Sequence, residues 1–125
     1  MHVYIFLDPF APLQVHSGWM RKKGHGMVLG SKMQRRHFIL YDNRELHYFD
    51  ARTTGVIGGG SFALEGLARK GSIRMATATK LARHRPSDSK DFTFVIKVPG
   101  RDFVLDPGSE AAYQEWEAKL RPMLG

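Results

Sequence analysis

The sequence predicts a mainly β domain that ends in a single helix. Short runs of aromatic and large aliphatic residues recur along the chain between Gly, Pro, Asn and Asp, which is typical of antiparallel strands joined by turns. Apolar residues spaced three and four apart, the pattern of an amphipathic helix, occur only near the end. A length of 125 residues suits one compact core. Seven short strands in series favour an antiparallel sandwich or barrel.

The strand pattern appears in seven segments. They are 15–22, 33–41, 45–49, 61–64, 72–77, 92–98 and 102–105. Asp, Asn and Arg at 42–44 predict a hairpin turn between the second and third strands, and Pro-Gly at 99–100 predicts the turn before the last. The stretches 51–60 and 78–89 lack the pattern and are predicted to be loops between strands.

The helix is predicted from one apolar stripe and its start signal. The stripe consists of Ala112, Tyr113, Trp116, Leu120 and Met123. Ser109 is the expected N-cap, and Glu110 is favourable at the positive end of the helix dipole. We therefore expect this helix to pack on the sheet through its stripe.

Residues 1–14 are predicted to be an N-terminal extension, and residues 15–125 the domain itself. The apolar run 3–7 is far shorter than the roughly 20 residues that cross a bilayer, and no basic segment precedes it. We expect neither a membrane span nor a signal peptide here. Since Asp8, Pro9 and Pro12 end the run, we interpret it as an extra strand or an arm packed on the domain.

The charge balance favours anionic partners. Lys and Arg number 19 against 12 Asp and Glu, which gives a net charge of +7. No acidic residue occurs between Pro9 and Tyr41, so the N-terminal third is expected to be the positive pole. The absence of Cys excludes disulfides and thiolate sites and fits an intracellular protein.

Three strand segments and the helix carry a family resemblance. Residues 17–22 read Ser-Gly-Trp-Met-Arg-Lys, residues 33–40 read Met-Gln-Arg-Arg-His-Phe-Ile-Leu, and residues 46–49 read Leu-His-Tyr-Phe. These resemble, in order, the patterns Gly-x-Leu-x-Lys, Trp-x-x-Arg-x-Phe-hydrophobic-Leu and Leu-x-Tyr-Tyr of the pleckstrin homology (PH) domain, and Trp116 resembles its helix tryptophan. The resemblance implies a partly open seven-stranded antiparallel barrel capped at one end by the C-terminal helix.

Strand alternation predicts where three polar side chains point. Lys22 shares its direction with Met20, Arg36 with Phe38, and Tyr48 with Leu46. Because a buried cation without a partner is costly, we expect all three where the sheet opens to water, at a mouth between the first two strands. Two cations and a phenol there form a phosphate site.

By its resemblance to PH domains, this mouth is expected to bind a phosphoinositide headgroup. Lys22 and Arg36 would be the main anchors and Tyr48 a hydroxyl donor. Gln34 stands where binders of 3-phosphorylated lipids usually carry a basic residue, and Arg35 lies on the opposite strand face. The cations that could compensate from loops are Lys23, Lys32, His25 and Arg52.

The loop after the first strand predicts a membrane contact of its own. Its tip, Met27, Val28 and Leu29, is apolar and uncharged, with glycines and then cations on either side. Exposed apolar residues on such a tip favour insertion into a bilayer. The alternative is that Val28 and Leu29 fold back onto the domain.

No pattern in the sequence predicts catalysis, a cofactor or a metal site. The glycine-rich stretch 55–61 lacks the Lys of a phosphate loop, and the six His have no metal-ligand spacing. Nucleic-acid binding would need interleaved exposed aromatics, so we expect no nucleic-acid partner.

We therefore predict a cytoplasmic, non-catalytic module that binds phosphoinositide headgroups and is recruited peripherally to anionic membranes. By family analogy it would be the N-terminal module of a larger signalling protein such as a kinase. The alternative is a protein-interaction domain on the same scaffold with weak or no lipid specificity, in which a peptide pairs with a sheet edge or docks beside the helix.

Overall fold

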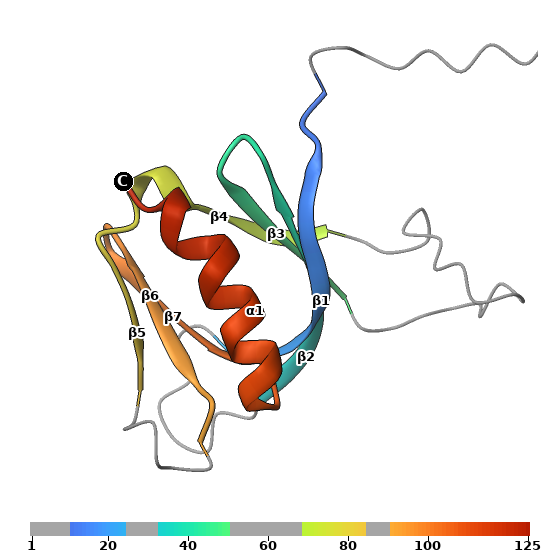
Figure 1. The fold of residues 1–125 in the computed structure, drawn as a ribbon, viewed down its shortest axis with the longest axis vertical. Helices are drawn as coiled ribbons and strands as arrows, with labels where there is room; N and C mark the ends of the chain where they lie inside the picture. The colour runs from blue at the N-terminus through green and yellow to red at the C-terminus, as the bar shows by residue number, and fades with distance from the viewer. Residues whose placement is uncertain (1–10, 25–32, 51–68, 85–90) are drawn as a thin grey trace, which may run out of the picture.

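The computed structural model describes residues 11–24, 33–50, 69–84 and 91–125. Within these residues, seven antiparallel strands form one sheet and are followed by a single α-helix (Figure 1). The strands are β1 (Gln14–Lys23), β2 (Met33–Tyr41), β3 (Glu45–Asp50), β4 (Arg69–Arg74), β5 (Lys80–Arg83), β6 (Phe94–Val98) and β7 (Arg101–Asp106). The helix is α1 (Glu110–Leu120), and two 3-10 turns are η2 (Met75–Thr77) and η3 (Arg121–Met123).

The sheet is a partly open barrel, as predicted. Its strand order is β4-β3-β2-β1-β7-β6-β5, so β4 and β5 are its edges. The two halves join where β1 pairs with β7, through Arg21 opposite Asp106 and Lys22 opposite Leu105. Figure 1 shows α1 lying across the sheet between β1 and the β5–β7 strands. No helix among the described residues is long and apolar enough to cross a bilayer.

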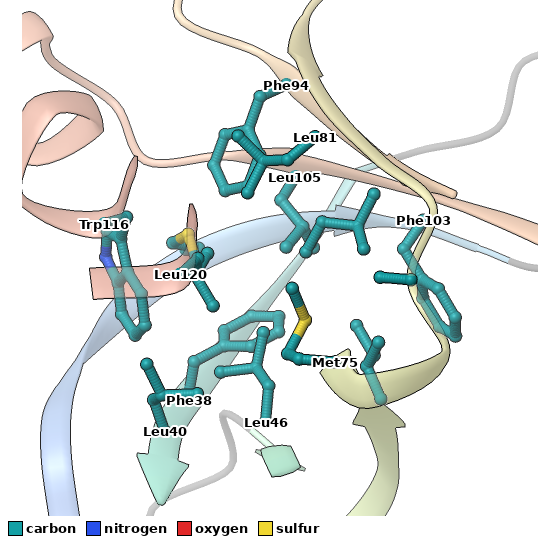
Figure 2. Packing of buried hydrophobic residues seen from close by; sticks show 14 of the residues in the cluster. Phe38, Leu40, Leu46, Met75, Leu81, Phe94, Phe103, Leu105, Trp116 and Leu120 are labelled. Carbon is teal, nitrogen blue, oxygen red and sulfur yellow. The ribbon is translucent and has the colours of Figure 1, made fainter. Parts of the chain in front are cut away.

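Buried side chains from both halves of the sheet and from the helix form one core (Figure 2). Those labelled in the figure are Phe38, Leu40, Leu46, Met75, Leu81, Phe94, Phe103, Leu105, Trp116 and Leu120. The Trp116 ring lies edge-on to His16 at 4.4 Å and to Phe38 at 6.4 Å. A Cβ on Gly18 would lie 3.5 Å from the indole, so β1 passes directly beneath it. The predicted helix stripe therefore anchors α1 to the sheet.

Polar contacts fix both ends of the helix. The Ser109 hydroxyl accepts a hydrogen bond of 3.1 Å from the backbone N–H of Ala112, which confirms the predicted N-cap. Arg83 of β5 donates to both carboxylate oxygens of Glu110, at 2.9 and 2.8 Å. Beyond the C-terminus of α1, Arg44 donates to the carbonyls of residues 123 and 124 at 2.9 and 2.7 Å. Strand hairpins on both sides thus hold the helix in place.

The predicted strand boundaries hold in most places and fail in two. The segment 33–41 matches β2, but 72–77 continues past β4, because Met75 turns into η2 and is fully buried. The segment 78–89 was predicted to be a loop, yet residues 80–83 form β5 against β6. Only one residue of this four-residue strand, Leu81, is buried, so the strand is too short to show a detectable alternation of buried and exposed residues. The predicted strand 61–64, the loop 51–60 and the apolar run 3–7 lie outside the described residues.

Candidate functional site

Lys22 is a buried cation near the end of β1. Its side chain points into the barrel as predicted, but it is only 6% exposed rather than open to water. The ammonium lies 4.9 Å from the ring centroid of Tyr48 and 5.8 Å from that of Phe103, and it donates a 3.3 Å hydrogen bond to the carbonyl of Lys23. Among the described residues no carboxylate lies within ion-pair distance of it. Two aromatic rings, and not the water we expected, therefore surround this charge.

Burial and two neighbouring guanidinium groups lower the pKa of Lys22 from 10.5 to about 8. Burial is the largest cause, because it disfavours the charged ammonium. The positive charges of Arg101 and then Arg36 add to the effect. Three cations therefore act on one another at this end of the barrel, and an anion bound among them would relieve their repulsion.

Arg101, the first residue of β7, is a site residue that the sequence reasoning missed. Its guanidinium carbon lies 4.1 Å from the ring centroid of Phe103, so Arg101 and Lys22 contact the same aromatic ring. The signal was present in the sequence. Arg101 lies two residues before Phe103 and four before Leu105, which are both buried, so strand alternation directs it to the same face.

Arg36 is half-buried on β2, on the strand face that also carries Phe38. Its guanidinium donates two hydrogen bonds of 3.0 Å, one to the carbonyl of Arg35 and one to the side-chain oxygen of Gln34. Gln34 is opposite Lys22 in the β1–β2 register. The residue that interrupts the basic pattern thus fixes the position of Arg36 and contributes no charge.

Tyr48 is 7% exposed and packs against Phe38 at 5.7 Å between ring centroids. Its neighbour on β4 is Gly71, where a Cβ would overlap the Tyr48 hydroxyl and ring. The backbone of β4 can therefore approach this ring only because residue 71 has no side chain. The contact with Lys22 is made by the ring face, and the predicted role of the hydroxyl as a donor stays a prediction.

The structure describes only some of the remaining predicted site residues. Lys23 is exposed at the end of β1, and Arg35 lies on the outer strand face, as predicted. The other loop residues, Lys32, His25, Arg52, Met27, Val28 and Leu29, lie outside the described residues. Within the part of the chain that the structure describes, no group of His, Asp and Glu could hold a metal ion.

The arrangement at this end of the barrel suits an anion with several oxygens. Lys22 offers a point charge, whereas Arg36 and Arg101 offer planar forks that grip phosphate through paired hydrogen bonds. Asp50 lies opposite Arg36 in the β2–β3 register and forms an ion pair with Lys70 at 3.5 Å. Among the described residues, no ion pair joins Lys22, Arg36 or Arg101 to a carboxylate.

The PH domain family model matches residues 14–124, so the chain belongs to the PH domain family. PH domains are generally non-catalytic modules. No curated protein matches the chain.

Solved PH domains share the fold at low sequence identity. The C-terminal PH domain of pleckstrin, in complex with D-myo-Ins(1,2,3,5,6)P5, aligns with a TM-score of 0.66 at 17% identity, over 91% of this chain and 98% of that one. The human PH domain of pleckstrin homology domain-containing protein family A member 5 aligns with a TM-score of 0.63 at 21% identity, over 96% of this chain and 83% of that one. The PH domain of ArhGAP27 aligns with a TM-score of 0.66 at 13% identity, over 88% of this chain and 99% of that one.

Proposed function

We propose that this PH domain binds phosphoinositide headgroups at the mouth formed by Lys22, Arg36 and Arg101 and thereby targets membranes. The observation that carries the proposal is the buried Lys22, which has two guanidinium groups near it and no carboxylate partner among the described residues. Burying such a cation costs free energy, and a bound phosphate would recover it. The site thus suits an anionic ligand better than it suits an empty, purely structural role.

The solved relatives support an inositol phosphate as the ligand class. The C-terminal PH domain of pleckstrin has been crystallised with two different inositol pentakisphosphates. An inositol ring carrying several phosphates would let Lys22, Arg36 and Arg101 each engage a separate oxygen. The uncharged Gln34 limits the positive charge on β2, so we expect selectivity to depend on phosphate position more than on total charge.

A vesicle sedimentation assay with the 125-residue chain tests this proposal. Phosphatidylcholine vesicles, each doped with a different phosphoinositide, are compared at one fixed salt concentration. Losing a charge-assisted hydrogen bond costs about 1.5 to 3 kcal/mol, so Arg36→Ala and Arg101→Ala should each weaken binding by roughly tenfold or more. Arg74→Ala is the matched control, because Arg74 is exposed at the opposite end of β4 from the mouth.

The outcomes separate this function from its main alternative. Unchanged binding by both folded mouth variants would refute the site. Binding of the wild type to no phosphoinositide, with the fold intact, would favour a protein-interaction domain with weak or no lipid specificity. In either function the domain itself would perform no chemistry and would act as the N-terminal module of a larger signalling protein such as a kinase.

We further propose that Met27, Val28 and Leu29, with the nearby Lys23 and Lys32, contact the bilayer directly. Replacing the three apolar residues together by Ser should weaken attachment to vesicles and leave affinity for a soluble inositol phosphate nearly unchanged, because only insertion depends on burying hydrocarbon. Added salt should weaken the electrostatic part instead. Loss of stability, or equal loss of both kinds of binding, would mean that the tip packs on the domain.

A further inference from the structure

An open hollow with a volume of about 430 Å³ lies on the outer face of the sheet, where β2, β1 and the end of β7 meet. The residues that matter are Trp19 and Arg21 of β1, Arg35 of β2, and Asp106 and Pro107 after β7. Its volume falls within the roughly 300 to 1,000 Å³ range of ligand pockets. It is distinct from the mouth, because none of the mouth cations Lys22, Arg36 and Arg101 is among its lining residues, and Lys22, next to Arg21, points inward and is buried.

Strand register places the charges of the hollow in one row. Arg21 is opposite Arg35 on one side and opposite Asp106 on the other. Both arginines are exposed, and the guanidinium of Arg35 stacks over the Trp19 ring at 4.3 Å. Stacking holds this guanidinium in place, so part of its ordering cost is already met in the free protein.

The two guanidinium groups are not neutralised within the described part of the chain. Neither Arg21 nor Arg35 forms an ion pair there. Asp106 lies opposite Arg21 but forms no ion pair with it among the described residues, and one of its carboxylate oxygens accepts a 2.9 Å hydrogen bond from the backbone N–H of Gly108. Like charges directly opposite each other on neighbouring strands repel, and a single anion between them would remove that repulsion.

We propose that this hollow binds an acidic peptide segment of a partner protein. A Glu or Asp carboxylate would be held by Arg21 and Arg35, and a neighbouring apolar side chain would pack on Trp19 and Pro107. The Asp106 carboxylate in the lining would repel a headgroup carrying several phosphate charges, whereas it tolerates a ligand with one local charge and a donor-rich backbone. The mixed apolar and basic lining therefore favours a peptide over a lipid surface, and this inference does not depend on lipid binding at the mouth.

An NMR titration of the 125-residue chain tests the proposal with two capped peptides, Ac-Leu-Glu-Leu-NH2, which carries one carboxylate, and its uncharged match Ac-Leu-Gln-Leu-NH2. The acidic peptide should shift the indole N–H resonance of Trp19, assigned with Trp19→Phe, in a saturable way. The uncharged peptide should bind at least about tenfold more weakly. Arg21→Ala and Arg35→Ala should each bind the acidic peptide about tenfold more weakly than the wild type. Arg74→Ala and the mouth variant Arg36→Ala should bind it as the wild type does.

Three results would overturn the proposal. The first is the absence of saturable shifts with the acidic peptide when the spectrum shows a folded chain. The second is equal binding of both peptides, which would mean that the arginines recognise no carboxylate. The third is that vesicles of phosphatidylcholine and phosphatidylserine, and not the acidic peptide, depend on Arg21 and Arg35, which would make this face a membrane contact.

Discussion

Replacing Lys22 with Met should stabilise the fold and weaken headgroup binding at the same time. Burial and the neighbouring guanidinium groups lower the pKa of Lys22 from 10.5 to about 8. One unit of pKa corresponds to about 1.36 kcal/mol, so keeping this ammonium charged costs roughly 3 kcal/mol. Contacts with the rings of Tyr48 and Phe103 return about 0.5 to 2 kcal/mol. A thioether of similar length avoids the cost, and we expect a net gain of about 1 to 2 kcal/mol near pH 7.

This gain should depend on pH in a defined direction. Below pH 8 the ammonium is charged in both the folded and the unfolded chain, so the full cost is present. Between pH 8 and 10.5 the folded chain loses the proton first, the unfolded chain binds more protons, and the free energy of unfolding of the wild type rises with pH. The advantage of Lys22→Met should therefore be constant below pH 8 and shrink toward pH 10.5.

Urea denaturation of both chains across this pH range measures the difference, and vesicle sedimentation measures the binding. Met cannot bind phosphate, so the stabilised variant should bind phosphoinositide vesicles roughly tenfold or more weakly than the wild type. A Lys22→Met chain that is less stable than the wild type at pH 7 would contradict the reasoning. So would a stability difference that does not change between pH 8 and 10.5.

Two further substitutions test the packing that positions the site. Gly71→Ala should destabilise the fold by about 1 to 3 kcal/mol, because the added methyl overlaps Tyr48. Chemical denaturation measures this, with exposed Ser72→Ala as the control, and an unchanged midpoint would show that β4 does not approach the ring so closely. Trp116→Ala should cost about 3 to 5 kcal/mol, because α1 loses its largest contact with the sheet. A thermal midpoint within a degree or two of the wild type would mean that the helix is not anchored through Trp116.

Local pattern was enough to predict much of this fold. β2 is rich in aromatic and large aliphatic residues and is followed by a strong turn signal, so its boundaries were predicted correctly. The N-cap at Ser109 follows from a short-range hydrogen bond. β5 was missed because it forms through pairing with β6 and not through a pattern of its own. The turn at 75–77 was missed because burial of Met75 overrides its strand-like surroundings.

The sequence was enough to predict which way the site's side chains point, but not how deeply they are buried or which hydrogen bonds they form. Alternation was sufficient to direct Lys22 and Tyr48 into the barrel. The depth of Lys22 depends on Phe103, which comes from the other half of the sheet and reaches it only through β1–β7 pairing. The hydrogen bond between Arg36 and Gln34 depends on side-chain torsions that no sequence pattern specifies.

Calorimetric titration of the chain with a soluble inositol trisphosphate at pH 8 tests the central claim most directly. A phosphate bound beside Lys22 raises its pKa, so binding should take up about half a proton, seen as a difference between buffers of unlike ionisation enthalpy. Any change in protonation of the ligand's own phosphates is common to both chains, so comparison with a variant at residue 22 isolates the proton taken up by Lys22. Lys22→Arg, which stays charged, should bind without this uptake. Tight binding with equal proton uptake in both chains would place the phosphates away from Lys22 and contradict the account.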